Sequence, residues 1–353
     1  MDIPSTQNIE VIDSPCAFDA LGEHWADLGE PRFGPVVSHD WYACAARAFA
    51  AGARLHMIAL WRDRRLAAVA PFARVRSRGI ERLEFLGDRE LFEPAQLLAA
   101  DEAALGALCA ALVRLRLPLV LQRLEVDDPA LRLLHEAARG RGTVRTVARA
   151  DTHRLSRGTT WTQVGGSQAG YRRKLRKLQA FGAVTFTVES PAPAQLAPLL
   201  EEAIAVEARA WKAHVGGALA TNPRLGGFFR DFCARLAVRG QLRIAVLRVD
   251  GAAVAVQLCA EQDGRLWVLK MGYDEKYAAC SPGLLLTTDL IRHTLEQRAA
   301  GFEFLGVAED WQRPWNPQTR RHCALLYYPR TLAGAAALTF DTVGARVSRR
   351  ARA

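Results

Sequence analysis

The chain has 353 residues, half of them hydrophobic, which is enough for about two domain cores. Charges interrupt every apolar stretch and no secretory-signal pattern opens the chain, so we expect a cytoplasmic protein without a transmembrane segment. Seven dispersed cysteines and eight unclustered histidines argue against a disulfide framework and against a metal site. The net charge of +10 favours an anionic partner, although an arginine-rich composition typical of GC-rich genomes explains it equally well.

Two segments share the layout of a β-hairpin followed by a short strand. Residues 58–62 and 66–72 flank one polar turn, and residues 244–248 and 252–258 flank another. The sequence Glu-Phe-Leu-Gly closes both, at 84–87 and again at 303–306. This repeated order predicts an internal duplication, whereas chance similarity between Ala/Leu-rich strands is the alternative.

The two copies differ between the hairpin and the Glu-Phe-Leu-Gly segment. In the second copy we expect a strand over 265–271, then a loop, then a helix over 283–300 that is closed by Gly301. Only residues 74–83 fill this interval in the first copy. If the inserted strand, loop and helix carry the chemistry, only the second copy is catalytic.

The remaining pattern is largely helical and suggests the domain boundaries. Apolar residues at helical spacing predict helices over 101–115, 194–211 and 227–238. A stretch rich in Thr, Ser and Gly, 148–166, is the expected linker. We therefore predict an N-terminal domain 1–150, a C-terminal domain 151–340, and a basic tail 341–353 that frays.

The segment after strand 265–271 is the strongest candidate site. Ser281-Pro282-Gly283 opens the predicted helix, and such a start leaves backbone N–H groups free to bind phosphate or pyrophosphate. An ordinary capped helix has the same sequence features. Walker A and G-x-G-x-x-G motifs are missing here, which argues against a nucleoside triphosphate or dinucleotide.

Several stretches resemble the CelD/BcsL-type branch of the GNAT superfamily, which is similar to the Fem aminoacyl-transferases with their tandem GNAT units. The resemblance covers about residues 154–328 and is looser before them. It is carried by 171–178, Glu207 with Trp211-Lys212, Phe228-Phe229, 269–274, Ser281-Pro282-Gly283, Phe304-Leu305-Gly306, Glu309 and Trp311. It implies an α/β (α+β) fold of two tandem GNAT-like units, the first degenerate, each a mixed, mostly antiparallel sheet flanked by helices.

The resemblance also implies acetyl-CoA, or another acyl-CoA, as co-substrate, with its pyrophosphate on the helix start and no metal. The residues that this assigns to the cofactor are Met271, Gly272, Ser281, Pro282, Gly283 and Leu284. Ser281-Pro282-Gly283 stands in place of the G-x-G signature of ordinary GNATs. An aminoacyl-tRNA donor, as in Fem proteins, therefore stays open.

Acyl transfer from a thioester requires deprotonation of the acceptor, polarisation of the carbonyl and protonation of the leaving thiolate. We expect Glu309 to be the general base, with Asp274 as second candidate. Tyr273 is the candidate acid, and Lys270 is placed to stabilise phosphate or the developing oxyanion. Either carboxylate fits a helix cap or an ion pair equally well.

A basic helix and several tryptophans are the candidate substrate-binding elements. Four like charges on one face of helix 171–178 lack acidic partners, so a bound anion would relieve their repulsion, while a solvated charged face is the alternative. The tryptophans fit stacking on a sugar or packing within the protein. The residues in this group are Arg172, Arg173, Arg176, Trp211, Lys212, Trp311 and Trp315.

The sequence therefore predicts an acyltransferase that acts on an amine or hydroxyl of a sugar or polysaccharide precursor, in keeping with the cellulose or exopolysaccharide association of the family it resembles. We expect no DNA partner. Two alternatives stay open: a Fem-like transferase that uses charged tRNA, and a non-catalytic scaffold or regulator with a GNAT fold.

Overall fold

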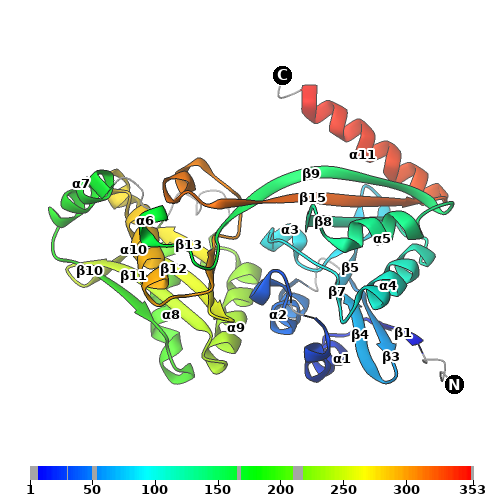
Figure 1. Cartoon of the computed structure of the whole chain (residues 1–353), viewed down its shortest axis with the longest axis horizontal. Helices are drawn as coiled ribbons and strands as arrows, with labels where there is room; N and C mark the ends of the chain where they lie inside the picture. Colours follow the sequence, from blue (N-terminus) through cyan, green and yellow to red (C-terminus); the bar gives the residue numbers. More distant parts are fainter. Residues whose placement is uncertain (1–6, 30, 50–53, 165–167, 210–217, 351–353) are drawn as a thin grey trace. The chain divides into compact units, whose positions relative to one another are not determined.

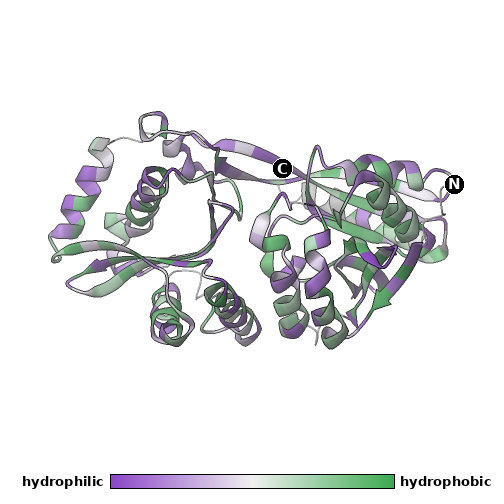
Figure 2. Ribbon diagram, turned by 60° about the horizontal axis from the view of Figure 1, so that its bottom comes forward, coloured by the Kyte–Doolittle hydropathy of each residue, from purple (hydrophilic) through white to green (hydrophobic). Residues whose placement is uncertain are grey.

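Both predicted hairpins are present in the computed structural model, which describes residues 7–29, 31–49, 54–164, 168–209 and 218–350. Contacts divide the chain into two units, unit 1 with residues 1–150 and 321–353, and unit 2 with residues 151–320. Each unit is a mixed α/β layer structure with mostly antiparallel strands flanked by helices (Figure 1), which confirms the predicted fold class. Apolar residues concentrate on the strands and on the inner sides of the helices (Figure 2).

Unit 1 contains two groups of paired strands, in the orders β1-β3-β4-β7 and β15-β8-β6-β5-β2. Its strands are β1 Gln7–Ile12, β2 Arg54–Leu55, β3 Met57–Arg62, β4 Arg65–Ala70, β5 Phe72–Ser77, β6 Ile80–Phe85, β7 Leu98–Ala99, β8 Leu119–Glu125, β9 Gly142–Leu155 and β15 Gln318–Pro329. Its helices are α1 Pro15–Asp19, α2 His39–Phe49, α3 Asp88–Leu91, α4 Glu102–Arg114, α5 Pro129–Ala137 and α11 Leu332–Arg350, with short 3-10 turns at Ala20–Asp27 and Gly34–Val37.

Residues 74–83, which separate the hairpin from the Glu-Phe-Leu-Gly segment in the first copy, belong to a second hairpin and not to a helix. β5 and β6 pair in antiparallel register from Phe72↔Phe85 to Ser77↔Ile80, and β6 then runs parallel to β8. Helix α4 begins after Asp101, whose side chain accepts a hydrogen bond from the N–H of Ala104. Its apolar face, with that of α5, closes the core of unit 1.

The C-terminal domain boundary and the tail differ from the prediction. Residues 321–340, expected in the C-terminal domain, group with unit 1, where β15 pairs with β8 from His322↔Glu125 to Tyr327↔Leu119. Residues 341–350, expected as a tail, continue helix α11. Ala337 of α11 lies over the sheet beside Tyr328, which secures this part of the helix. Among the described residues, no helix combines the length and apolarity that a membrane span requires.

Unit 2 has one group of paired strands, in the order β10-β11-β12-β13-β14, with the last residues of β9 beside β14. Its strands are β10 Val184–Glu189, β11 Leu242–Val249, β12 Ala252–Gln262, β13 Arg265–Tyr273 and β14 Gly301–Glu303. Its helices are α6 Trp161–Val164, α7 Gln168–Gln179, α8 Leu196–Glu207, α9 Pro223–Val238 and α10 Pro282–Glu296, with 3-10 turns at Pro193–Gln195, Glu275–Cys280 and Asp310–Trp315.

Helix α10 covers one face of this sheet, and α8 and α9 lie on the other (Figure 1). Leu285, Leu286 and Ile291 of α10 are fully buried against apolar side chains of β11, β12 and β13. Buried Gln257 of β12 donates a hydrogen bond of 2.7 Å to the hydroxyl of Thr287, which ties the helix to the sheet at one polar point. The sheet therefore presents two different environments, one on each face.

Two predicted helix bounds in unit 2 are wrong. The helix expected over 227–238 begins four residues earlier, at Pro223, because the Asn222 side chain caps the N–H of Leu225. The helix expected over 283–300 begins at Pro282 and ends at Glu296, so Gly301 does not cap it. Gly301 begins β14 instead, with a Cβ position only 2.8 Å from the carbonyl oxygen of Leu155.

Asp88, directly after the first Glu-Phe-Leu-Gly, makes the stability of unit 1 pH-dependent. Its Oδ1 atom is buried and accepts no hydrogen bond from the described residues. Burial, assisted by the Glu84 carboxylate, raises the pKa of Asp88 to about 7 in spite of nearby Arg123 and Arg89. A carboxyl whose pKa is raised on folding destabilises the fold increasingly as the pH rises from its ordinary pKa of about 4.

We therefore expect Asp88→Asn to raise Tm by more at about pH 8 than at about pH 5. Thermal unfolding of both proteins across this range checks it. The matched control is Asp101→Asn, because that carboxylate is exposed and its pKa is lowered by Arg62. A gain in Tm for Asp88→Asn that is the same at both pH values would contradict the prediction.

Candidate functional site

Strand β13 contains a β-bulge that changes which face its side chains occupy. In its pairing with β12, Leu258 lies opposite Lys270 and Cys259 lies opposite Val268, so Leu269 is an extra residue. Val268 packs in the core that α10 covers, and in a regular strand Lys270 would face the same way. The bulge turns Lys270 to the opposite face, where it meets α8.

The bulge lies where β13 parts from β14. The two strands pair in parallel only from Arg265↔Gly301 to Trp267↔Glu303, after which β14 ends. β13 continues to Tyr273, and among the described residues no strand covers this part of its outer edge. Exposed backbone N–H groups of such an edge are suitable donors to a polarised carbonyl.

The N-terminus of α10 lies against the end of β13, so three of the predicted cofactor residues, Met271, Gly272 and Gly283, lie close to one another. A Cβ atom placed on Gly283 would be 3.3 Å from Cδ1 of Tyr273 and 4.0 Å from Cε of Met271. Pro282 occupies the first turn, where no backbone donor is lost. Ser281 precedes it with φ +53°, a left-handed conformation that is uncommon outside glycine.

A lysine that the sequence analysis did not select completes this region. Nζ of Lys174, on α7, donates a hydrogen bond of 2.8 Å to Oγ of Ser281. This places an ammonium group beside the positive end of the α10 dipole, an arrangement that is electrostatically unfavourable without an anion nearby. The Ser281 region therefore combines three features of a phosphate site: a cation, a hydroxyl and a helix start.

Helix α7 is held in this position by contacts with α10. Tyr171 donates a hydrogen bond of 2.7 Å to Asp289, and the Arg292 guanidinium lies 5.5 Å from the Tyr171 ring and 4.7 Å from the Trp161 ring. Burial and the Asp289 carboxylate raise the pKa of the Tyr171 phenol, so it remains a donor to Asp289. The position of Lys174 is thus set by packing one turn earlier on the same helix.

The opposite face of β13 carries a buried ion pair. Nζ of Lys270 lies 3.3 Å from Oε1 of Glu207, the last residue of α8, and 5.9 Å from the Phe229 ring centroid. Glu207 is 2% exposed and accepts a hydrogen bond of 2.9 Å from the N–H of Leu219. A Cβ atom on Gly272 would lie 2.5 Å from the Glu207 Cα, so glycine alone allows this close approach.

The two carboxylates that the sequence analysis proposed as bases have local structural partners. Asp274 pairs with Arg209 at 3.3 Å and accepts the N–H of Lys276, which caps the following 3-10 turn. Glu309 is exposed, caps the turn 310–315 and accepts a hydrogen bond of 2.5 Å from Nε1 of Trp311. The geometry of Asp274 and Glu309 therefore supports roles as caps and ion-pair partners, the alternative to a general base.

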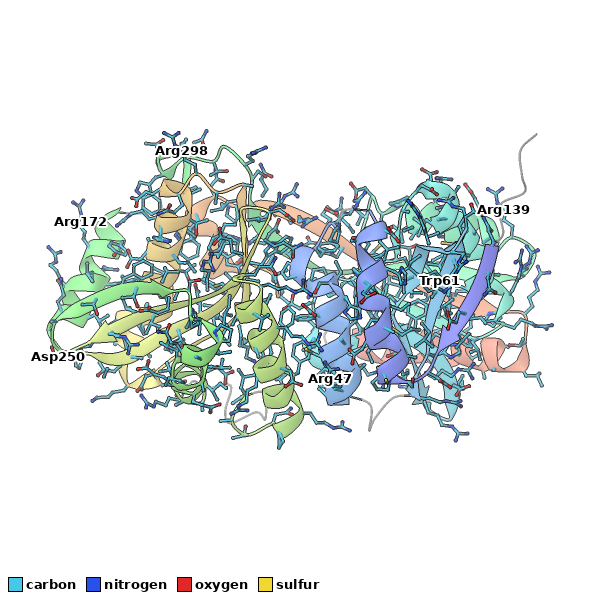
Figure 3. All side chains as sticks on the ribbon, turned by 90° about the horizontal axis from the view of Figure 1, so that it is seen from below. Arg47, Trp61, Arg139, Arg172, Asp250 and Arg298 are labelled. Atoms are coloured by element: carbon cyan, nitrogen blue, oxygen red, sulfur yellow. The ribbon has the colours of Figure 1, made fainter. Side chains whose placement is uncertain are left out.

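The proposed substrate-binding residues do not gather at one place. Arg172, Arg173 and Arg176 are exposed on the outer face of α7, and Arg172 lies at the edge of unit 2 (Figure 3). Trp315 is 2% exposed and packs on Phe304 and Trp311, so its ring is not available for stacking on a ligand. Trp311 is partly exposed, while Trp211 and Lys212 lie outside the described residues.

Residues 167–313 match the family model described as an acetyltransferase (GNAT) domain. This matched part of the chain contains β13 with its bulge and helices α7, α8 and α10. No protein of curated function matches the chain in sequence. Within the described ranges, no group of three His, Cys, Asp or Glu side chains gathers where it could hold a metal ion.

Solved structures share the fold along both units. The C-terminal domain (DUF2156) of a putative lysylphosphatidylglycerol synthetase from Agrobacterium fabrum is 15% identical, with a TM-score of 0.57 over 94% of this chain and 96% of that one. FemX is 12% identical, with a TM-score of 0.55 over 91% and 97%. A tandem GNAT protein from the clavulanic acid biosynthesis pathway is 14% identical, with a TM-score of 0.51 over 91% and 98%.

These similarities show the fold, and with the family match they confirm the resemblance to tandem GNAT proteins and to FemX. The narrower resemblance to the CelD/BcsL-type branch stays a prediction. The residues that match the family model include the second copy, from its hairpin at 244–258 to the Glu-Phe-Leu-Gly segment at 303–306.

The two glycines of the site provide a matched test of its packing. Gly272→Ala places a methyl group against the backbone of α8, which has to move, and such overpacking costs about 1–3 kcal/mol. Gly283→Ala meets only the Tyr273 ring at 3.3 Å and gains helix propensity, so we expect little change. Thermal unfolding should show a clear loss of Tm for the first variant alone, and equal losses would contradict the packing described here.

Proposed function

We propose that residues 167–313 catalyse the transfer of an acyl group, acetyl in the first instance, from acyl-CoA to an amine or hydroxyl of a sugar or polysaccharide precursor. The observation that carries this proposal is the Lys174 ammonium at the N-terminus of α10, beside the uncovered edge of β13. A cation and a helix start that point to the same place favour a ligand with phosphate groups.

The residues present fit the two ends of an acyl-CoA. Lys174, Ser281 and the first turn of α10 would hold the pyrophosphate through charge and hydrogen bonds. Gly283 leaves the space beside Tyr273 and Met271 that a side chain would fill. Together they support an acyl-CoA as the bound co-substrate, which supplies the acyl group as an activated thioester.

The remaining roles fall to groups on β13 and α8. Backbone N–H groups along 270–272 are the donors that we assign to the carbonyl oxygen of the acyl group. Lys270 and Glu207 form the one ion pair that adjoins the bulge in the described residues, so we assign them to proton transfer from the acceptor. Tyr273, at the end of the strand, is the group that we assign to protonation of the leaving thiolate.

The acceptor class rests on the family resemblance and on one side chain. Trp311 is partly exposed in the loop after β14, and an aromatic face at this place suits stacking on a sugar ring. Glu309 holds the Trp311 indole through the hydrogen bond described above. In this proposal Glu309 orients the acceptor site, and Glu207 replaces it as the preferred base.

One observation favours a different donor. The exposed side chains of Arg172, Arg173, Arg176 and Lys177 form a basic face on α7, close to Lys174. Such a face also suits the backbone of a charged tRNA, the donor implied by the resemblance to Fem proteins. A tRNA complex would lose orders of magnitude in affinity as salt rises, whereas binding of acyl-CoA would respond only weakly.

Substitution of Lys174 tests the acyl-CoA site. We expect acetyl-CoA to raise the Tm of the unaltered protein and ATP to leave it unchanged. Lys174→Ala removes a charge-assisted hydrogen bond and should weaken acetyl-CoA binding about tenfold or more in a titration calorimeter.

Lys177→Ala is the matched control, because Lys177 lies on the same helix with an exposed side chain. An equal loss of affinity in both variants would show a diffuse charge effect and would remove the support for the site. Absence of any stabilisation by acetyl-CoA would favour the tRNA donor or a non-catalytic role.

Substitution of Glu207 tests the proton-transfer assignment. We expect Glu207→Gln to lower kcat about a hundredfold while leaving the affinity for acetyl-CoA unchanged. Release of thiol from acetyl-CoA in the presence of amino sugars provides the assay.

Glu202→Gln is a matched control, since Glu202 is also on α8 and pairs with a strand residue, Arg248. Binding of acetyl-CoA separates a catalytic defect from a folding defect. If both variants lose the same fraction of kcat, Glu207 only supports the fold and the assignment fails.

A further inference from the structure

Helix α11 has one face that packs on unit 1. Ala337 is fully buried among Ile80, Val120 and Tyr328. On the same side, Asp341 accepts hydrogen bonds of 2.8 Å from Arg82 and from the Tyr328 hydroxyl. These contacts fix the orientation of the helix at the surface of unit 1, where it begins beside the end of β15 (Figure 1).

The opposite face of α11 exposes large apolar side chains. Leu332 is 93% exposed, Val343 is 53% exposed and Phe340 is 41% exposed. Their spacing of eight and three residues places all three within an arc of about 80° on the helix surface. Clusters of this kind on one face mark an interaction surface, whereas single exposed apolar residues do not.

Cations surround this apolar stripe. Arg330 and Arg141 are exposed next to Leu332, joined by a hydrogen bond of 2.9 Å between the Arg330 N–H and the Arg141 carbonyl. Arg78 is exposed beside Phe340, with its guanidinium 6.0 Å from the ring centroid and a hydrogen bond of 3.3 Å to the Phe340 carbonyl.

Acidic residues are nearly missing from this region. Asp341 is the single Asp or Glu in residues 311–353, and it is the residue paired with Arg82 on the buried side. The exposed side therefore joins an apolar stripe to Arg78, Arg141 and Arg330, which form no ion pair with a described residue. This combination is typical of helices that lie in the interface of an anionic membrane.

We propose that this surface of α11, formed by Leu332, Phe340 and Val343 with Arg78, Arg141 and Arg330, docks unit 1 on an anionic lipid bilayer. The helix lies along the bilayer with its apolar stripe among the acyl chains and its arginines at the headgroup phosphates. A second copy of this chain is a poorer occupant, because it would bring two arginine-rich surfaces together. The proposal is independent of the transferase chemistry, since it uses residues of unit 1 alone.

The test is sedimentation of the full chain with vesicles of phosphatidylcholine alone and of phosphatidylcholine mixed with phosphatidylserine. We expect the protein to pellet with the mixed vesicles and to be released as salt rises, because screening weakens the headgroup contacts. The double variant Leu332→Gln, Val343→Gln should bind these vesicles about a hundredfold more weakly, since it removes two large apolar side chains from the interface.

Val238→Gln is the matched control, because Val238 is 73% exposed at the end of α9, in unit 2. This variant should bind as the unaltered protein does, and circular dichroism should show that all variants keep their helix content. Equal binding to both kinds of vesicle, an equal loss in the control variant, or no pelleting would overturn the proposal. A concentration-dependent dimer that the double variant abolishes would also overturn it, in favour of a second copy.

Discussion

The extra residue in β13, Leu269, is the constraint on which the candidate site depends. Without it, Lys270 would face α10 and the buried pair with Glu207 would not form. The bulge also lies next to the last residue of β13 that pairs with β14. The strand therefore has an uncovered edge where the alternation of its side chains between the two faces shifts by one residue. The Lys270–Glu207 pair on the α8 face and the Lys174–Ser281 contact on the α10 face are therefore separated by one strand.

The two faces of β13 differ in their charges. The contacts of Tyr171 with Asp289 hold the Lys174 ammonium at the positive end of α10, and no described carboxylate contacts Ser281 there. On the α8 face, Glu207 and Lys270 neutralise each other. The α10 side of the strand is therefore electropositive, whereas the charges on the α8 side cancel.

The two copies share one segment and differ in the element that follows the hairpin. Both Glu-Phe-Leu-Gly segments bury their glutamate against arginine, Glu84 with Arg89 at 2.6 Å and Glu303 with Arg265 at 2.8 Å. Only the second copy continues from its hairpin into a bulged strand and a long helix, while the first fills the same interval with the β5–β6 hairpin. The candidate site is therefore formed by the elements that only the second copy contains.

The sequence alone predicted both hairpins and the Ser281-Pro282-Gly283 helix start, because periodicity and turn chemistry are local properties. The tandem α/β architecture and the site roles of Met271 and Tyr273 were implied by the family resemblance. Only the tertiary structure decided the bulge at Leu269, the approach of Lys174 to Ser281, the burial of Trp315 and the helical path of residues 341–350. Each of these depends on which strand or helix lies opposite, and that information is non-local. The sequence pattern around a charged or aromatic loop residue is the same whether the side chain is exposed to a ligand or buried by its neighbours.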